Sequence, residues 1–199
     1  MGEKTRIFLA RHGETEWNSR DLVQGQTDVS LSETGEKQAT KLADRLADAP
    51  LDYVYCSGLS RSRRTAELVG APHDLEPIVE PALAEQDFGE WDGDTLSELY
   101  GMLDRTGTDW TDWAPENGES WTEFSQRVRT ALERIVTSHR GECLFVCAHG
   151  GVNKVVLTHA LFSDTSRRSD VEQGTACLNE LTYTGTYDVH AINDDSHVQ

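Results

Sequence analysis

The sequence predicts an α/β fold in which helices cover both faces of a largely parallel sheet. Two observations carry this prediction: short apolar runs typical of strands recur along the chain, and longer segments with apolar residues at helical spacing separate them. Helices of this length between strands are typical of crossover units, which join parallel strands. The 199 residues, 37% of them hydrophobic, suit one well-buried core. We therefore expect a single domain over residues 1–199.

The strand and helix candidates alternate in order. Strands are expected at 4–10, 52–56 and 143–148, followed by a C-terminal pair near 177–183 and 186–192 that is joined at Thr184-Gly185. Helices are expected at 32–48, 60–69, 119–139 and 151–161. The first helix begins with Ser32 as its cap and carries Ala39, Leu42, Ala43 and Leu46 at helical spacing.

The stretch 92–118 differs from the rest of the chain. It is rich in Asp, Thr, Gly and Trp and contains only a weak helical pattern at 95–103. A segment of this composition is typical of a functional loop rather than of a separate domain. We expect 92–118 to form a cap or loop insert over the functional site.

The formal net charge of −17 limits the partners of this protein. Nucleic acid and anionic membranes would repel such a surface, so neither is expected as a partner. Lysine occurs only four times, and arginine carries most of the positive charge. Two interpretations stay open: a protein adapted to a high-salt cytosol, where screening removes self-repulsion, or an ordinary acidic protein. A homodimer also stays open.

Hydropathy and the cysteines bear on location and metal content. No stretch approaches the roughly 20 apolar residues of a membrane span, and the N-terminus lacks an apolar signal region, so we expect a cytoplasmic location. Cys143 and Cys147 lie just before His149. Four strand residues separate them by about 13 Å, at roughly 3.3 Å per residue, too far to share one metal ion. We expect buried free thiols and no metal site.

Two histidines follow predicted strands. Arg11-His12-Gly13-Glu14 comes after the apolar run 7–10, and His149-Gly150-Gly151 comes after 143–148. In an open α/β sheet, ligands bind beyond the carboxyl ends of the strands. Two histidines and an arginine at that edge can converge on one anion, which points to phosphoryl transfer.

These motifs resemble the histidine phosphatase superfamily, and further matches extend along nearly the whole chain in family order. They are Thr15-Glu16-Trp17-Asn18, Gln24-Gly25, Leu31-Ser32-Glu33-Thr34-Gly35, Ser57 with Arg61, Thr65-Ala66, Glu85 ahead of Phe88-Gly89-Glu90-Trp91-Asp92-Gly93, Gly118-Glu119-Ser120 and His149-Gly150-Gly151. The resemblance implies a three-layer α/β/α sandwich with a largely parallel mixed sheet. It also implies a small phosphorylated substrate and no cofactor.

The resemblance assigns roles to five catalytic candidates. His12 would be the nucleophile that forms a phosphohistidine. Arg11 and Arg61 would clamp the transferring phosphoryl group, and His149 would add a donor when phosphate is bound. Glu85 would protonate the leaving alkoxide. Weaker candidates for the acid are Asp87 and Glu90, and the expected pocket-lining set is Thr15, Asn18, Gln24, Gly25 and Gly150.

The reaction itself has three candidates. A phosphatase of the broad-specificity or alpha-ribazole type is favoured, because 93–118 contains only Arg105 as a base and because Gln24-Gly25-Gln26 replaces the threonine-glycine-tryptophan usual in mutases. A cofactor-dependent phosphoglycerate mutase is the alternative. A noncatalytic phosphate-binding module is the third, and the presence of a proton donor, Glu85, argues against it. Trp91, Trp110, Trp113 and Trp121 could pack in the core and cap or form an aromatic wall for the substrate.

Overall fold

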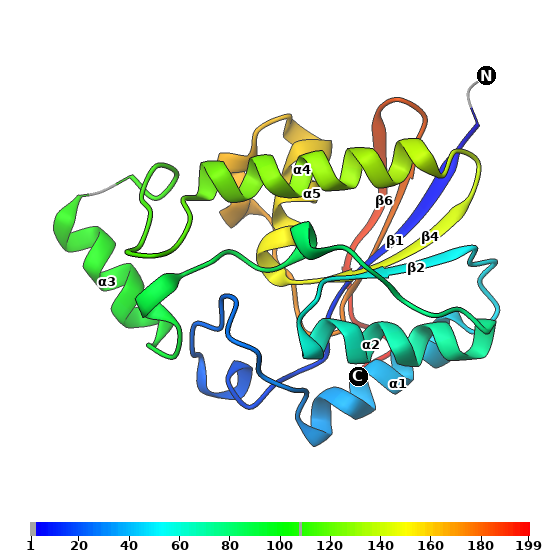
Figure 1. Cartoon of the computed structure of the whole chain (residues 1–199), viewed down its shortest axis with the longest axis horizontal. Helices are drawn as coiled ribbons and strands as arrows, with labels where there is room; N and C mark the ends of the chain where they lie inside the picture. Colours follow the sequence, from blue (N-terminus) through cyan, green and yellow to red (C-terminus); the bar gives the residue numbers. More distant parts are fainter. Residues whose placement is uncertain (1–2, 108) are drawn as a thin grey trace.

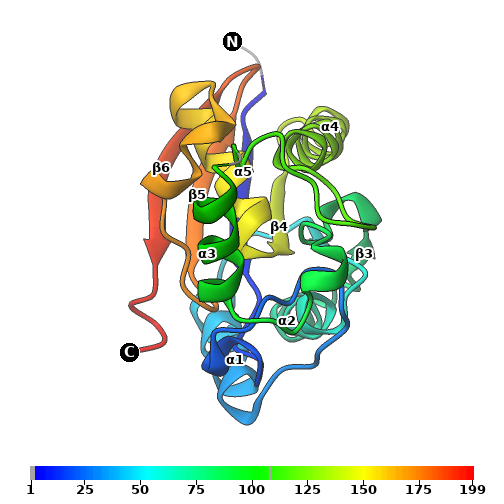
Figure 2. The ribbon, with the colours of Figure 1, turned by 90° about the vertical axis from the view of Figure 1, so that its left-hand side faces the viewer.

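A six-stranded mixed sheet forms the centre of the molecule. We describe a computed structural model in which residues 3–107 and 109–199 are placed. The strand order is β3-β2-β4-β1-β5-β6. The pairs β3–β2, β2–β4 and β4–β1 are parallel, and β1–β5 and β5–β6 are antiparallel. Helices lie on both faces of this sheet (Figures 1 and 2), so the predicted α/β/α class is confirmed.

The chain forms its elements in the order strand, helix, strand over most of its length. The strands are β1 (Thr5–Arg11), β2 (Tyr53–Cys56), β3 (Ile78–Val79), β4 (Cys143–Ala148), β5 (Leu178–Tyr183) and β6 (Tyr187–Asp194). The α-helices are α1 (Glu33–Leu46), α2 (Ser60–Gly70), α3 (Leu96–Thr106), α4 (Trp121–Ser138) and α5 (Gly150–Phe162). Short 3-10 segments are η1 (Asn18–Arg20), η2 (Ala71–His73), η3 (Pro81–Leu83), η4 (Gly89–Trp91) and η5 (Thr165–Asp170).

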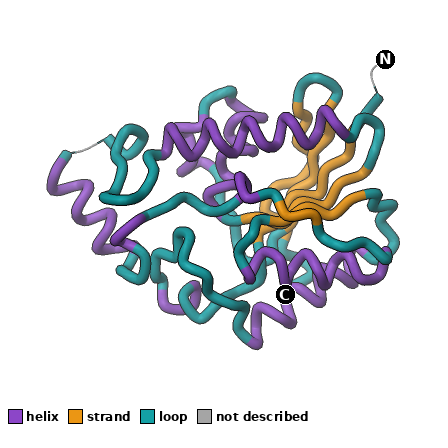
Figure 3. The backbone as a smooth tube through the Cα atoms, viewed as in Figure 1, coloured by secondary structure: helices purple, strands orange, loops and turns teal. Residues whose placement is uncertain are grey.

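Alternate residues of the central strands build two separate cores, because successive side chains of a strand point to opposite faces. Ile7 and Leu9 of β1 belong to the core that α4 and α5 cover. Phe8 and Ala10 belong to the other core, under α1 and α2. All six residues of β4 are buried, as expected for a central parallel strand covered on both faces. Figure 3 shows the strands running together between the two helical layers.

The sequence predictions for regular elements agree with the structure. The strand at 143–148 is found with those bounds, and the other four predicted strands differ by one or two residues at their ends. Ser32 caps α1, its side chain accepting from the Gly35 amide at 3.1 Å. The weak pattern at 95–103 is a full helix, α3, which begins with a capping box of Thr95 and Glu98. The two-residue strand β3 was not predicted.

Helix α3 lies apart from the sheet and has a small core of its own (Figure 1). Leu99 and Leu103 are buried there with Val23, and Phe88, Met102, Trp91, Trp110 and Trp113 pack against them. Packing therefore accounts for three of the four tryptophans named above. The fourth, Trp121, is buried in the large core under α4 and α5.

The remaining expectations concern cysteines, metals and membranes. All four cysteines are buried free thiols, as predicted. Burial raises the pKa of Cys56, Cys143 and Cys177 to about 11, so these thiols stay protonated at neutral pH. In the part of the chain that the structure describes, no helix has the length and hydropathy to cross a membrane. The same residues contain no group of three His, Cys, Asp or Glu side chains arranged to hold a metal ion.

Candidate active site

Strand register brings the two histidines together. Strands β1 and β4 pair in parallel, and Arg11 is opposite Ala148 at the end of the ladder. The next residues are His12 and His149, and the His12 amide donates to the Ala148 carbonyl at 3.1 Å. Their imidazole rings pack edge to face, with centroids 5.1 Å apart. Two short motifs far apart in sequence therefore share one corner of the sheet edge.

The ring of His12 is held in its neutral form. It is 2% exposed, and Nδ1 lies 2.7 Å from the Gly13 carbonyl oxygen. A carbonyl only accepts, so Nδ1 carries the proton and Nε2 keeps its lone pair. Burial, and then the charges of Arg61 and Arg11, hold the pKa of His12 well below its ordinary value of 6.5. The imidazole is therefore uncharged at neutral pH, with its single proton on Nδ1.

His149 lies behind His12 and is fully buried. Its Nε2 is hydrogen-bonded to the Ser57 hydroxyl at 2.7 Å, and its Nδ1 has no hydrogen-bond partner among the described residues. Burial, followed by the charges of Arg61 and then His12, holds the pKa of His149 well below 6.5. A bound phosphate would reverse the sign of this local charge, so the predicted protonation of His149 requires the ligand.

Two arginines supply positive charge and have hydrogen-bond donors that no described protein group uses. Arg61, in the first turn of α2, is 1% exposed and donates to the Thr27 and Gly25 carbonyls, each at 2.8 Å. Arg11 donates to the Gln173 carbonyl at 2.7 Å. The buried Nε atoms of both arginines lack partners among the residues that the structure describes. Burial lowers the pKa of Arg61 to about 10 and also lowers the pKa of Arg11, and both remain charged at neutral pH.

Glu85 is attached to the first turn of α5, the helix that follows His149. Its Oε2 accepts from the Gly151 amide at 2.9 Å, and its Oε1 accepts from the Gln86 amide at 2.9 Å. A side chain at position 151 would overlap with Oε1 of Glu85. The second glycine after His149 is therefore required for this contact, because it lets the carboxylate reach the backbone of the helix N-terminus.

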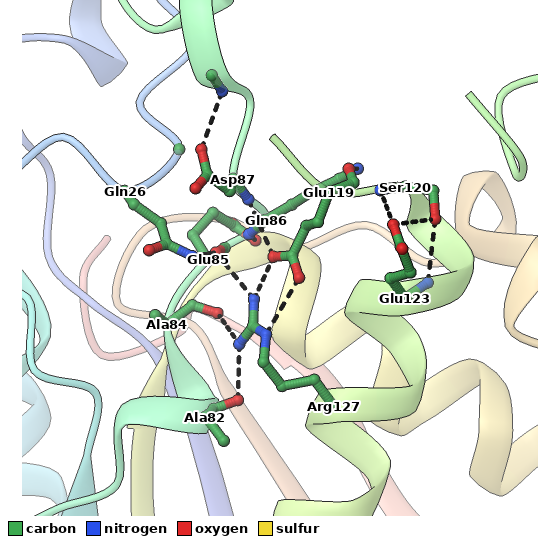
Figure 4. A network of polar contacts seen from close by, with 12 residues as sticks. Gln26, Ala82, Ala84, Glu85, Gln86, Asp87, Glu119, Ser120, Glu123 and Arg127 are labelled. Carbon is green, nitrogen blue, oxygen red and sulfur yellow. Dashed lines mark hydrogen bonds and ion pairs between the residues drawn. The ribbon is translucent and has the colours of Figure 1, made fainter. Parts of the chain in front are cut away.

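Arg127 of α4 holds the segment that carries Glu85 (Figure 4). It donates to the carbonyls of Ala82 at 2.8 Å, Ala84 at 3.0 Å and Glu85 at 3.3 Å. Its guanidinium also pairs with the Glu119 carboxylate. Since Glu119 in turn accepts from the Asp87 amide at 3.0 Å, the whole segment from Ala82 to Asp87 is tied to the start of α4.

The loop after β1 forms another wall of the site. Thr15 is buried, and its hydroxyl donates to the side chains of Gln24 at 2.9 Å and Asn18 at 3.1 Å. Gly25 has φ of +44°, in the left-handed region that favours glycine. A Cβ at position 25 would also overlap with the Asp92 carboxylate. Thr15 therefore orients the two amides from behind, while Gly25 allows the tight turn that Arg61 anchors.

These groups surround a cavity of about 230 Å³. Of the predicted site residues, the cavity is lined by Arg11, His12, Asn18, Gln24, Gly25, Arg61, Glu85 and Gly150. His149 and Thr15 are not part of the lining and lie behind it. Asp87 and Glu90 do not line the cavity either, so its geometry favours Glu85 as the acid. A larger hollow of about 410 Å³ near Tyr187 lies among α4, α5 and the β5–β6 hairpin and holds none of these groups.

Sequence reasoning missed part of the lining. Lys154, Arg168, Gln173 and Tyr100 also face the cavity. A signal existed for Lys154, because it follows Gly150 by four residues and so lies on the same face of a helix that starts there. Arg168 had no motif around it, and its placement depends on how η5 folds back after α5. Trp121 lines the cavity as well, although only 2% of it is exposed.

Comparison with known proteins confirms the resemblance predicted above. A sequence model of the histidine phosphatase superfamily (branch 1) matches residues 7–195. A probable phosphatase of Schizosaccharomyces pombe is 30% identical over 98% of this chain and 95% of its own. The adenosylcobalamin/alpha-ribazole phosphatase of Salmonella typhimurium is 35% identical over 78% of this chain and 79% of its own. The crystal structure of a phosphoserine phosphatase of Entamoeba histolytica in complex with 3-phosphoglyceric acid matches with a TM-score of 0.87 and 25% identity, covering 98% of this chain and 100% of that one.

Proposed function

The chain belongs to the histidine phosphatase superfamily, and from this premise we propose that it hydrolyses small phosphomonoesters through a phosphohistidine on His12. One observation carries the assignment to these residues. Beside the neutral imidazole of His12, the Nε atoms of Arg11 and Arg61, both of which line the cavity, have no hydrogen-bond partner in the described part of the chain. Unsatisfied buried donors are costly, and the oxygens of a phosphate would satisfy them.

In the first step, Nε2 of His12 attacks phosphorus. The N–P bond forms while the P–O bond to the alcohol breaks, and a proton from Glu85 goes to the leaving oxygen. Arg11 and Arg61 stabilise the charge that develops on the three equatorial oxygens of the phosphoryl group. The depressed pKa of His12 keeps its lone pair available for this attack at neutral pH.

In the second step, water attacks the phosphohistidine. The Glu85 carboxylate takes a proton from the water, the new P–O bond forms and the N–P bond breaks, which returns His12 to its neutral form. Inorganic phosphate then leaves through the cavity. The net reaction converts an ester and water into an alcohol and phosphate, and it uses no cofactor.

Two alternatives share this site. A cofactor-dependent phosphoglycerate mutase would form the same phosphohistidine but return the phosphoryl group to a substrate hydroxyl instead of water. A noncatalytic phosphate-binding module would use Arg11 and Arg61 and would have no need of Glu85. Substitution of Glu85 separates the module from both enzymes, because binding would survive it and turnover would not.

The decisive experiment traps the intermediate and measures the products. Rapid quenching without acid, during turnover of a phosphomonoester, should trap acid-labile phosphate on His12, and His12→Ala should abolish turnover while the melting temperature stays close to wild type. Trapping on serine or cysteine would refute the mechanism. With 3-phosphoglycerate and bisphosphoglycerate, phosphate release should exceed formation of 2-phosphoglycerate. Faster isomerisation would make the mutase the better assignment.

The organisation around the reaction follows from the same proposal. We propose one domain over residues 1–199, with 92–118 acting as a cap, since Leu96 and Tyr100 of α3 line the cavity. The hydropathy of the sequence supports a cytoplasmic location. The acidic composition leaves adaptation to high salt open, and a homodimer also stays open.

A further inference from the structure

Two cations that have no role in the proposed reaction also line the cavity. Lys154 lies on α5, one helical turn after Gly150, and Arg168 lies in η5. Both face the same cavity as His12 and Glu85. Neither of them comes from the cap segment 92–118, in which Arg105 is the single lysine or arginine.

Neither cation has a carboxylate partner within residues 3–107 and 109–199. The chain has 35 acidic residues against 18 lysines and arginines, so unpaired, half-buried cations are unexpected in it. The Lys154 ammonium makes no hydrogen bond or ion pair with another described residue. The Arg168 guanidinium lies 3.6 Å from the ring centroid of Trp110 and 5.2 Å from that of Trp121, with the Tyr100 side chain as its polar neighbour. The rings orient Arg168 without neutralising its charge.

Lys154 interacts electrostatically both with Arg168 and with residues of the proposed phosphate site. Burial lowers the pKa of Lys154, and the next largest cause is repulsion by Arg168. Lys154 also experiences the charges of Glu85, Arg11 and Glu172. Burial lowers the pKa of Arg168 as well. Two desolvated like charges disfavour each other, and a bound anion would relieve both the repulsion and the lost solvation.

We propose that Lys154 and Arg168 form a second anion subsite, which binds a carboxylate or a second phosphate on the alcohol part of the substrate. This inference rests on the proposed function, since it assumes that Arg11 and Arg61 hold the transferring phosphoryl group. The lining of the cavity also includes Leu96, Phe88 and Trp121, which suit a short carbon chain. Arg168 suits a planar carboxylate, because its fixed donors make paired hydrogen bonds.

A matched pair of substrates tests the subsite. 3-Phosphoglycerate and glycerol 3-phosphate differ only by a carboxylate in place of a hydroxymethyl group. Wild-type kcat/KM should be at least about tenfold higher for 3-phosphoglycerate, the effect of one charge-assisted hydrogen bond. Lys154→Met and Arg168→Gln should each reduce this preference about tenfold or more and leave kcat/KM for glycerol 3-phosphate within about threefold. A bisphosphate, fructose 1,6-bisphosphate, is the third substrate and distinguishes phosphate from carboxylate as the second anion.

Arg167→Gln is the matched control. Arg167 adjoins Arg168, but it pairs with Asp170, stacks over Phe162 and does not line the cavity. The Arg167→Gln variant should keep the wild-type preference for 3-phosphoglycerate over glycerol 3-phosphate. If Arg168→Gln lowers the melting temperature, Lys154→Met decides alone, because its ammonium has no bond to lose.

The possible outcomes test the second subsite and the proposed phosphatase function independently. A preference for either anionic substrate that both variants remove supports the subsite and identifies its anion. Variants that slow 3-phosphoglycerate and glycerol 3-phosphate equally, or a wild type without preference, overturn the subsite while phosphate release continues. Failure of the wild-type protein to release phosphate from any of the three esters, or from p-nitrophenyl phosphate, overturns the proposed function instead.

Discussion

Replacement of Arg127 by methionine should impair proton transfer although Arg127 lies outside the cavity lining. Methionine keeps much of the side-chain volume but removes the donors to the Ala82, Ala84 and Glu85 carbonyls and the ion pair with Glu119. Hydrogen bonds to a charged group contribute about 1.5–3 kcal/mol each when buried. The Arg127 side chain is 25% exposed, so water can replace part of this network. We expect the free energy of unfolding to fall by about 2 kcal/mol.

The catalytic loss should depend on the leaving group. Without Arg127, the Glu85 backbone loses its tether to α4, and the carboxyl keeps only its bonds to the Gly151 and Gln86 amides. A misplacement of about 1 Å costs on the order of a hundredfold in rate. We expect kcat for an alkyl phosphate to fall about 10- to 100-fold, which is about 1.4–2.7 kcal/mol of activation free energy. The loss should be much smaller for p-nitrophenyl phosphate, whose acidic leaving group needs little protonation.

Arg134→Met is the control for this experiment. Arg134 also lies on α4 and pairs with Glu80, just before the tethered segment, but its side chain is 63% exposed and it does not reach Glu85. An exposed pair of this kind contributes at most about 1 kcal/mol to stability, and kcat should not change. Equal losses on both substrates in Arg127→Met would show a general structural defect. An unchanged kcat, accompanied by the expected loss of stability, would refute the positioning role.

Four further predictions follow from charge and burial. Because the pKa values of buried His12 and His149 lie below 6.5, the unfolded chain binds more protons in acid, and the free energy of unfolding should fall below about pH 6.5 by up to about 1.4 kcal/mol per pH unit for each of them. Urea denaturation of a double His→Asn variant should give a smaller slope, and the remaining slope belongs to other groups such as His159 and His197, whose pKa values burial also lowers. Arg61→Ala should lose about 2–4 kcal/mol of transition-state stabilisation, measured as kcat. Excess chelator should leave phosphate release unchanged, and a loss that added metal restores would contradict the cofactor-free mechanism. Activity and melting temperature should rise together as KCl goes from dilute to molar if the charge of −17 is an adaptation to salt, whereas a monotonic fall of both identifies an ordinary acidic protein.

The elements with strong hydropathy patterns could be predicted, and the weakly patterned ones could not. Strand β4 is buried at all six positions, so its apolar run has sharp ends. Strand β3 has only Ile78 and Val79, both exposed, and exists because they pair with Tyr55 and Cys56 of β2. Two residues are too few to establish a period of two. Such an edge strand depends on its partner, and the partner is not visible in the local sequence.

The residues of the site differ in the same way: some could be located from local sequence patterns and others could not. Arg11, His12 and His149 could be located because each adjoins a strongly apolar strand, and parallel strands bring their carboxyl ends to one edge. Arg127 could not, because its contact with Glu85 spans 42 positions and depends on how α4 packs against the segment after β3. Arg168 depends in the same way on the chain reversal after α5. Local patterns predict where strands end, whereas helix orientation is decided by packing of the whole core.

The two ends of the cavity differ in how strongly the backbone fixes their side chains. The groups around the phosphate are fixed by backbone: His12 and His149 by strand register, Gly151 by the absence of space for a side chain, and Arg61 by two loop carbonyls. A side chain at position 151, or loss of the two carbonyl bonds of Arg61, would disturb the local structure together with the chemistry. Lys154 is different, because its ammonium makes no bond within the described residues and its backbone is ordinary helix. We infer that the alcohol end of the substrate can be respecified by substitution at position 154 at little cost in stability, while the phosphoryl end cannot. Equal melting temperatures for Lys154→Met and wild type, with a changed order of substrates, would be the expected sign of that independence.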